Sequence, residues 1–205
     1  MMYRIAYIDD EEDLVRQFQI NTMEDFDVIE LELRSDITEM QECIISSDIS
    51  ALVVDFLLND TKPEIHYNGV ELVEKIIGLR EDFPIFILTS HEIEAENTSI
   101  NPDVVYSKAL VNQDPNRFNR KIKRKIENHN KEIEDARSEL LELIAKSADL
   151  TLTEEERLIE LDGFLEKSSN KITAIPEHAK ELSYNKRLTE LIDKTEQLLK
   201  AIKES

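Results

Sequence analysis

The stretch Ala51-Leu52-Val53-Val54-Asp55 joins four apolar residues to a terminal carboxylate. A short apolar run that includes β-branched residues predicts a buried β-strand. A carboxylate in such a place is costly to desolvate unless a partner compensates its charge. Asp55 is therefore the first candidate for a functional residue.

Two other apolar runs also end in polar residues. They are Ile5-Ala6-Tyr7-Ile8, followed by Asp9 and Asp10, and Ile85-Phe86-Ile87-Leu88, followed by Thr89 and Ser90. If the three strands are parallel, these polar residues meet at one edge of the sheet, which is where open α/β sheets place their sites.

The first part of the chain alternates between strand and helix patterns. The predicted strands are 4–9, 27–33, 51–57, 84–89 and 104–107. Amphipathic stretches lie between them, marked by Leu14, Phe18 and Ile20, by Ile37, Met40, Ile44 and Ile45, and by Val70, Val73 and Ile77. This alternation predicts an α/β fold with a five-stranded, doubly wound parallel sheet. The polar stretch 91–101 predicts a short or irregular helix.

From residue 114 onward the sequence is helical. Asp114-Pro115 is typical of a helix start, and no Gly or Pro interrupts 116–148. Apolar positions recur every seven residues, at Ile126, Ile133 and Leu140 and, with one histidine, at Ile122, His129, Ala136 and Leu143. We expect one long helix whose early turns pack on the sheet and whose later turns extend beyond it. The spacing places His129 in an apolar seam, where it would fix register.

A second helix is predicted after a break at 147–152. A capping box in Thr153-Glu154-Glu155-Glu156 would open it, and 168–170 would end it. Leu158, Leu161 and Leu165 share one face, and beyond Pro176 a third apolar stripe follows at Tyr184, Leu188, Leu191, Thr195, Leu198 and Ile202. We expect two domains, 1–113 and 114–205. The second would be an antiparallel helical hairpin or small bundle, with a dimeric coiled coil as the alternative.

Composition narrows the classes of function. The net charge is -20, and residues 1–113 carry 25 acidic side chains against 7 basic ones. That balance disfavours nucleic acid as a partner, and it fits either solubility or a basic partner surface. A single cysteine, no signal peptide and no apolar stretch long enough for a bilayer predict a cytoplasmic protein without membrane association.

A basic cluster marks the start of the long helix, at Arg117, Arg120, Lys121, Lys123, Arg124 and Lys125. We favour a solvated helix face over a nucleic-acid contact, because no helix-turn-helix pattern follows. A dimer contact with carboxylates of a second copy is a third interpretation.

The strand ends define a candidate site. Asp9, Asp10 and Asp55 offer the hard oxygen ligands that Mg²⁺ prefers. Thr89 adds a hydroxyl donor, and Lys108, after the last strand, adds a positive charge. This set suits the acceptance of a phosphoryl group by an aspartate.

On these residues, segment 3–113 resembles the receiver domain of two-component response regulators. The matching motifs are Tyr7-Ile8-Asp9-Asp10-Glu11, Val53-Val54-Asp55, Asn68-Gly69-Val70-Glu71-Leu72, Ile87-Leu88-Thr89-Ser90 and Val105-Tyr106-Ser107-Lys108. The resemblance covers a little over half of the chain and implies a flavodoxin-like fold. It implies nothing about 114–205.

The resemblance also implies a role for each site residue. Asp55 would accept the phosphoryl group, Mg²⁺ would bind Asp9, Asp10, Asp55 and the backbone carbonyl of Leu57, and Thr89, Ser90 and Lys108 would contact the phosphoryl group. Leu57 and His91 would tune its hydrolysis, and an apolar Leu57 predicts a long-lived phosphoryl group. The donor would be a phosphohistidine on a histidine kinase or a histidine phosphotransfer protein. The chain would not be an enzyme beyond its own phosphorylation and dephosphorylation.

Three features depart from the receiver pattern. An insertion at 59–66 lies next to the predicted site, either shaping kinase choice or forming a passive excursion. Ala109 follows Lys108 where receivers often carry proline. Val105 stands where receivers often carry an aromatic switch residue, with Tyr106 beside it.

Three functions remain open at this point. The chain is a phosphorelay protein that signals through helical protein–protein contacts, a phosphate buffer without output, or a pseudo-receiver scaffold that is not phosphorylated. The intact acidic set speaks against the scaffold. A DNA-binding regulator is disfavoured by the balanced charge of 114–205, with 20 acidic and 18 basic residues.

Overall fold

A computed structural model describes residues 2–80, 82–90, 101–146 and 150–168. The chain forms two compact units, Met1–Glu134 and Asp135–Ser205. The predicted helix at 91–101 falls almost entirely outside the described residues, and the predicted third helical stripe, together with Pro176, lies wholly outside them.

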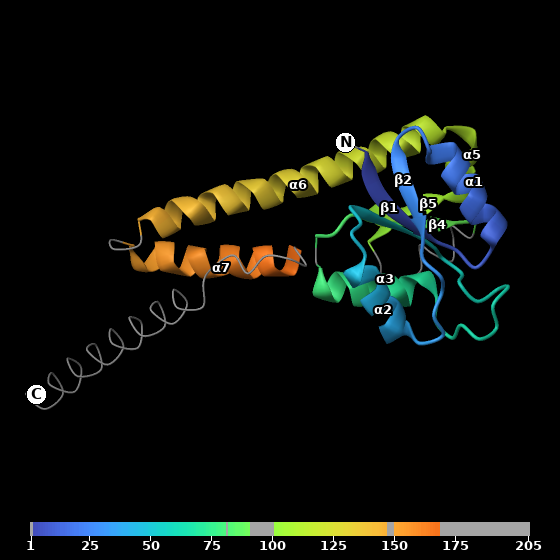
Figure 1. Cartoon of the computed structure of the whole chain (residues 1–205), viewed down its shortest axis with the longest axis horizontal. Helices are drawn as coiled ribbons and strands as arrows, with labels where there is room; N and C mark the ends of the chain where they lie inside the picture. Colours follow the sequence, from blue (N-terminus) through green and yellow to red (C-terminus); the bar gives the residue numbers. More distant parts are fainter. Residues whose placement is uncertain (1, 81, 91–100, 147–149, 169–205) are drawn as a thin grey trace, which may run out of the picture. The chain divides into compact units, whose positions relative to one another are not determined.

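The first unit is built around one parallel sheet (Figure 1). Its strands are β1 (Tyr3–Ile8), β2 (Phe26–Glu30), β3 (Ala51–Asp55), β4 (Ile85–Thr89) and β5 (Val105–Ser107), in the order β2-β1-β3-β4-β5. Every neighbouring pair is parallel. The chain reverses its direction of winding next to β1 and β3, so their carboxyl ends form the topological switch point of a flavodoxin-like sheet. The predicted α/β fold is confirmed.

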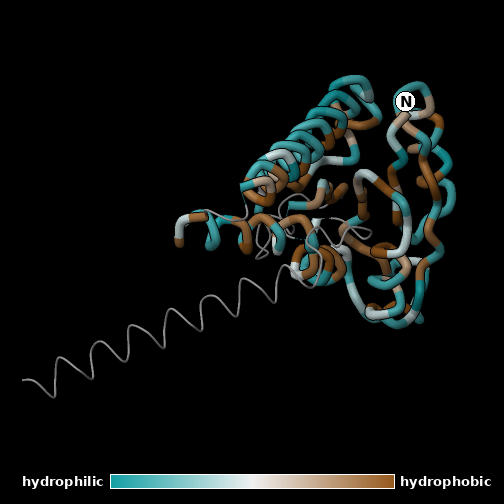
Figure 2. The backbone as a smooth tube through the Cα atoms, turned by 60° about the vertical axis from the view of Figure 1, so that its left-hand side comes forward, coloured by the Kyte–Doolittle hydropathy of each residue, from teal (hydrophilic) through white to brown (hydrophobic). Residues whose placement is uncertain are grey.

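Helices cover both faces of this sheet. They are α1 (Glu12–Thr22), α2 (Ile37–Ser46), α3 (Gly69–Leu79), α5 (Lys108–Gln113) and the first turns of α6 (Pro115–Ala145), with a 3-10 turn η1 at Pro102–Val104. Buried side chains of α2 and α3 share one core with alternate strand residues, and those of α1, α5 and α6 share the other. The helices alternate teal and brown along the tube in Figure 2, as amphipathic helices do.

The element boundaries differ slightly from the predicted ones. β1 ends at Ile8 and β3 at Asp55, one and two residues before the predicted strand ends. β2 ends at Glu30, three residues before its predicted end. The buried side of α1 consists of Val15, Phe18 and Thr22, while Ile20 is 62% exposed. Including Ile20 in the apolar face was wrong, because two residues of an α-helix turn it about 200° away from Phe18.

The long helix α6 is confirmed, and its first turns belong to the first unit. The Asp114 side chain accepts a hydrogen bond from the Arg117 amide at 3.0 Å, as predicted for its N-cap. Phe118, Ile122 and Ile126 are fully buried in the core on the α1 side of the sheet. At about 1.5–3 kcal/mol for each buried side chain, this contact fixes the start of α6 on the sheet.

His129 is buried, as its place on the apolar stripe predicts, but the aromatic side chain that it contacts, Phe83, belongs to the sheet unit. Its ring meets the edge of Phe83 at a centroid distance of 6.2 Å, in the turn before β4. The interpretation of His129 as a register-fixing residue in a helical seam was therefore wrong. The heptad pattern could not show this, because a stripe that packs on a sheet and one that packs on a helix have the same spacing.

The second unit contains the end of α6 and α7 (Leu152–Ser168). Arg157 donates two hydrogen bonds of 2.9 Å to the Glu139 carboxylate, and Lys146 pairs with Glu154 at 3.2 Å. From the first of these pairs to the second, the residue numbers rise along α6, from Glu139 to Lys146, and fall along α7, from Arg157 to Glu154. The two helices are therefore antiparallel, and the predicted antiparallel hairpin is confirmed for this part.

The cap of α7 differs from the predicted one. The Glu154 side chain accepts from the Thr151 amide at 2.9 Å, and the Thr151 hydroxyl accepts from the Glu154 amide at 3.3 Å. The capping box is therefore Thr151–Glu154, two residues before the predicted Thr153–Glu156. Both pairs fit the same sequence pattern, and the helix starts at the earlier one.

Within the described residues, no helix is both long and apolar enough to cross a membrane.

Candidate functional site

Asp55 closes a strand in which every residue is buried, and it is itself only 5% exposed. Its Oδ1 lies 2.7 Å from Lys108 Nζ, and its Oδ2 accepts a hydrogen bond from the Leu57 amide at 3.2 Å. Burial raises the pKa of Asp55 to about 6, even though the Lys108 ammonium acts in the opposite direction. Asp55 is thus a carboxylate of unusually high proton affinity, held next to a cation.

Asp9 and Asp10 follow the end of β1 and are equally buried. Asp9 Oδ2 accepts from the Tyr7 hydroxyl at 2.5 Å and from Lys108 Nζ at 3.0 Å, and Asp9 Oδ1 accepts from the Glu11 amide at 3.0 Å. The carboxylate of Asp10 accepts from the Thr61 amide instead. Asp10 is therefore held by Thr61, whereas Asp9 and Asp55 share the Lys108 ammonium.

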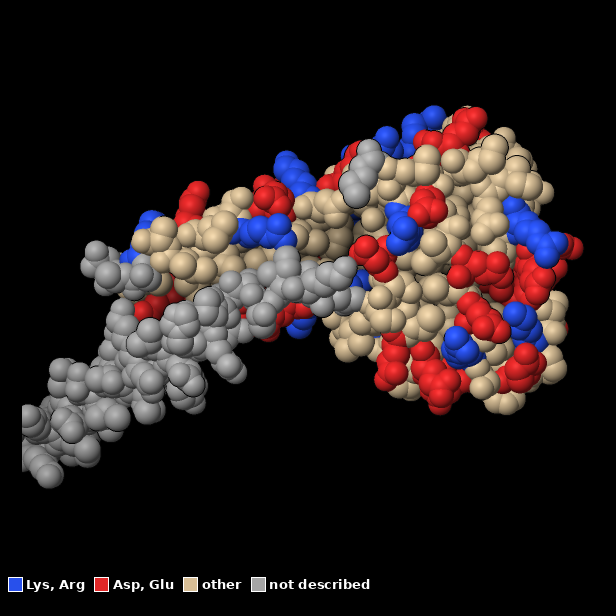
Figure 3. Space-filling view, in the orientation of Figure 1, with Lys and Arg blue, Asp and Glu red and all other residues tan. Residues whose placement is uncertain are grey.

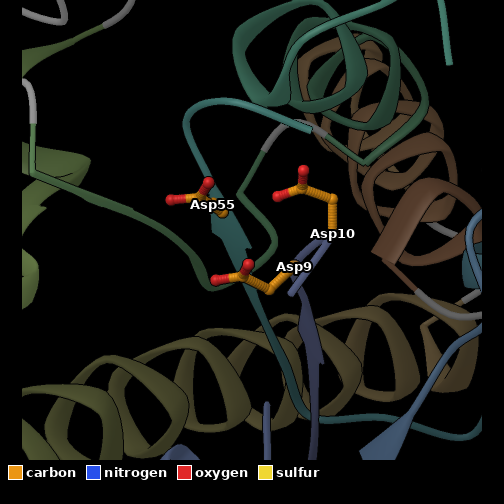
Figure 4. Close-up of side chains that lie close together, drawn as sticks. All are labelled: Asp9, Asp10 and Asp55. Carbon is orange, nitrogen blue, oxygen red and sulfur yellow. The ribbon is translucent and has the colours of Figure 1, made fainter. Parts of the chain in front are cut away.

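Asp9, Asp10 and Asp55 come together in space (Figure 4). Each offers one carboxylate oxygen, and the three oxygens lie within 4.8 Å of one another. Lys108 contributes one positive charge against these three acids, so a divalent cation would balance the set. Carboxylate oxygens at this spacing are also the ligands that Mg²⁺ takes up. The donor set therefore fits such an ion.

Lys108 links Asp9 to Asp55 from the first residue of α5. Burial by itself would lower the pKa of Lys108, but its hydrogen bonds and ion pairs with Asp55 and Asp9 raise it overall. The ammonium therefore stays charged, and it already lies beside the Asp55 oxygen. Ala109 donates its amide to the Ser107 hydroxyl at 3.2 Å, so α5 begins directly after β5.

The remaining predicted residues have different positions. Thr89 ends β4, is fully buried and pairs in register with Ser107. Ser90 is exposed and lines a cavity of about 150 Å³ together with Tyr7 and Lys108. Leu57 is half-buried and donates its amide to Asp55. His91 lies outside the described residues.

Tyr106 takes part in an aromatic cluster. Its ring centroid lies 5.7 Å from that of Phe86 and 5.5 Å from that of Phe118, and Lys121 Nζ lies 4.6 Å from the ring. Val105, at the position where receivers often carry an aromatic residue, packs instead against the core on the α2 and α3 side. The two neighbours therefore face opposite sides of the sheet.

Two contact residues of the site were not predicted. Tyr7 binds Asp9, and burial together with the Asp9 charge raises the pKa of its hydroxyl. Its place two residues before Asp9 was a usable signal, because residues i and i+2 of an extended chain share a side. Thr61 binds Asp10 from 51 residues away in the sequence, and no local pattern indicates such a contact.

Comparison with known proteins supports the fold. No protein-family model and no curated protein matches the chain. Among solved structures, the adenylate cyclase from Rhodopirellula baltica is similar at a TM-score of 0.52 and 19% identity, over 65% of this chain and 96% of that one. The Francisella response regulator 1452 receiver domain is similar at 0.47 and 14%, over 62% and 98%. RcsB from Salmonella enterica serovar Typhimurium, bound to a promoter, is similar at 0.43 and 14%, over 83% and 94%.

At 19% identity, the likeness to the adenylate cyclase structure bears on the fold alone. The sheet order and the acidic switch point define a flavodoxin-like α/β unit. The flavodoxin-like fold that the receiver resemblance implied is confirmed by the sheet order β2-β1-β3-β4-β5.

Proposed function

We propose that the chain is a phosphorelay protein of the response-regulator type, phosphorylated on Asp55. The observation that supports this most directly is the Asp55–Lys108 pair of 2.7 Å within a buried group of three carboxylates. Such a group is costly to keep in a folded protein, because each buried acid loses hydration. A phosphoryl-transfer site uses that arrangement, with a nucleophile, a cation site and a fixed positive charge in one place.

In the proposed reaction, an oxygen of ionised Asp55 attacks the phosphorus of a phosphohistidine on a histidine kinase or histidine phosphotransfer protein. The new oxygen–phosphorus bond forms as the phosphorus–nitrogen bond breaks, and the electron pair stays on the imidazole, which takes up a proton. Bound Mg²⁺, on Asp9, Asp10, Asp55 and the Leu57 carbonyl, would neutralise charge on the transferred group. The Lys108 ammonium would shift its ion pair from the Asp55 oxygen to a phosphoryl oxygen. Thr89 and Ser90 would be further hydrogen-bond donors to the phosphoryl group.

The proposed output is protein–protein contact through the helices of 114–205, either with a partner or with a second copy. Figure 3 shows acidic side chains spread over the face of the sheet unit that is in view, and side chains of both signs along the long helix. The proposal of a cytoplasmic location and the expectation that nucleic acid is not a partner stay predictions.

The test uses the full chain with acetyl phosphate and Mg²⁺, and intact-mass spectrometry detects the phosphoryl group. We expect labelling of wild type and none of Asp55→Asn. Asp27→Asn is the matched control, because Asp27 lies on β2 with a half-exposed side chain paired to Arg4. Labelling of Asp55→Asn as strong as that of wild type would contradict Asp55 as the phosphoryl acceptor. Absence of labelling in both wild type and Asp27→Asn would contradict the proposal and leave the non-phosphorylated scaffold as the alternative.

Light scattering with beryllofluoride then separates the outputs. A change in mass or shape that depends on Asp55 supports a signalling switch. Labelling without such a change favours the phosphate buffer.

A further inference from the structure

The insertion between β3 and α3 reaches the acidic site through one residue. The Thr61 amide donates to Asp10 Oδ2 at 2.5 Å, and the Thr61 hydroxyl donates to the Asp10 backbone carbonyl at 2.8 Å. One residue thus binds both the carboxylate and the main chain of Asp10. This contact restricts the side chain of Asp10 and the turn that carries it.

The insertion is anchored so that this contact has a fixed position. Leu58 on one side of Thr61 and Ile65 on the other are buried in the core beneath α2 and α3. The Ile65 amide closes a turn on the Lys62 carbonyl at 3.0 Å, and the Tyr67 hydroxyl donates to the Arg34 carbonyl at 2.6 Å. The ends of the insertion are therefore held by the core, and its exposed tip is held by Asp10.

We propose that Thr61 is a positioning residue for the cation site, which makes the insertion part of that site. The inference rests on the proposed function, because it assigns Asp10 to the cation. A carboxylate that binds a metal must present an oxygen in a fixed direction, and hydrogen-bond partners of metal ligands supply that constraint. Of the three carboxylates, Asp10 is the one that the insertion binds, through a donor far away in the sequence.

The test is calorimetric titration of the full chain with Mg²⁺. Thr61→Pro removes the amide donor to Oδ2, and we expect Mg²⁺ affinity to fall by roughly 10- to 100-fold, as for other losses of a ligand's partner. Thr61→Val removes only the hydroxyl bond, and we expect a smaller loss of affinity in the same direction. Thr61→Ser keeps both donors and restores wild-type affinity.

Two controls separate positioning from general damage to the fold. Glu64→Gln changes an exposed side chain of the same insertion, and its Mg²⁺ affinity should equal that of wild type. Thermal unfolding without divalent ions shows whether each variant keeps its fold. If Thr61→Pro loses stability in that measurement, the Mg²⁺ affinity of Thr61→Val relative to wild type tests whether Thr61 positions Asp10.

Unchanged Mg²⁺ affinity in folded Thr61→Val and Thr61→Pro would overturn the inference and leave the insertion a passive excursion. Absence of Mg²⁺ binding by wild type would overturn it as well. A failure of the proposed function alone gives another result. Wild type would then bind Mg²⁺ with an affinity that depends on Thr61, and acetyl phosphate would not label Asp55.

Discussion

Gly69 determines how closely α3 approaches the end of β3. Its amide donates to the Phe56 carbonyl at 2.9 Å, and a Cβ at this position would clash with the backbone carbonyl of Asp55. The clash is with main-chain atoms, which cannot turn aside as a flexible side chain can. The absence of a side chain at Gly69 is therefore a requirement for the position of Asp55.

We expect Gly69→Ala to lower the free energy of unfolding by about 1–3 kcal/mol, the usual cost of overpacking. It should also reduce acetyl phosphate labelling, because the added methyl group displaces the backbone of Asp55. Urea denaturation and intact-mass spectrometry measure the two effects.

Gly78 is the matched control for this change. It lies in the same helix, and a Cβ there would meet nothing within 4 Å. Gly78→Ala should stabilise the protein by about 0.5–1 kcal/mol and leave labelling unchanged. Equal effects of the two substitutions would show that the approach of α3 to Asp55 does not limit the site.

At the scale of elements, the start of α7 depends on one of two threonines that fit the same pattern. Thr151 makes the reciprocal bonds with Glu154, while Thr153 lies one residue inside the helix and is exposed. Thr151→Ala should cost about 1 kcal/mol, because it removes the cap. Thr153→Ala should change stability by less than about 0.5 kcal/mol.

Amide hydrogen exchange in the first turns of α7 measures both effects locally. Faster exchange in Thr151→Ala than in Thr153→Ala is the expected order. The reverse order would place the capping box at Thr153, as the sequence pattern alone suggested.

At the scale of the whole molecule, the division between the sheet unit and the helical unit falls within α6. The predicted boundary after residue 113 would leave Phe118, Ile122 and Ile126 outside the first domain, although all three are fully buried in its core. Their burial contributes about 5–9 kcal/mol in total. That is comparable to the whole stability of a typical domain, about 5–15 kcal/mol.

We therefore expect fragment 1–134 to unfold cooperatively in urea and fragment 1–113 to lack a cooperative transition. Circular dichroism of the two fragments checks this difference. A transition of 1–113 at the same urea concentration as 1–134 would show that α6 is not needed for the sheet unit to fold.

Much of this architecture could be predicted from local patterns. Each strand near the site is a short apolar run, and parallel strands bring their ends together, so the meeting of Asp9, Asp10 and Asp55 followed from the sequence. The contact of Thr61 with Asp10 did not follow, because it depends on how an insertion folds over a distant turn. The same holds for His129, whose spacing fits a helix partner as well as a sheet partner.

The contact between Tyr7 and Asp9 has a spectroscopic consequence. The chain contains five tyrosines and no tryptophan, so its intrinsic emission comes from tyrosine alone. A phenol that donates to a carboxylate is quenched, and the Tyr7 hydroxyl donates to Asp9 at 2.5 Å. An ion that draws Asp9 away from this bond would brighten Tyr7. The acidic site therefore contains its own fluorescent reporter, which needs no label and lies within one hydrogen bond of the carboxylate it senses.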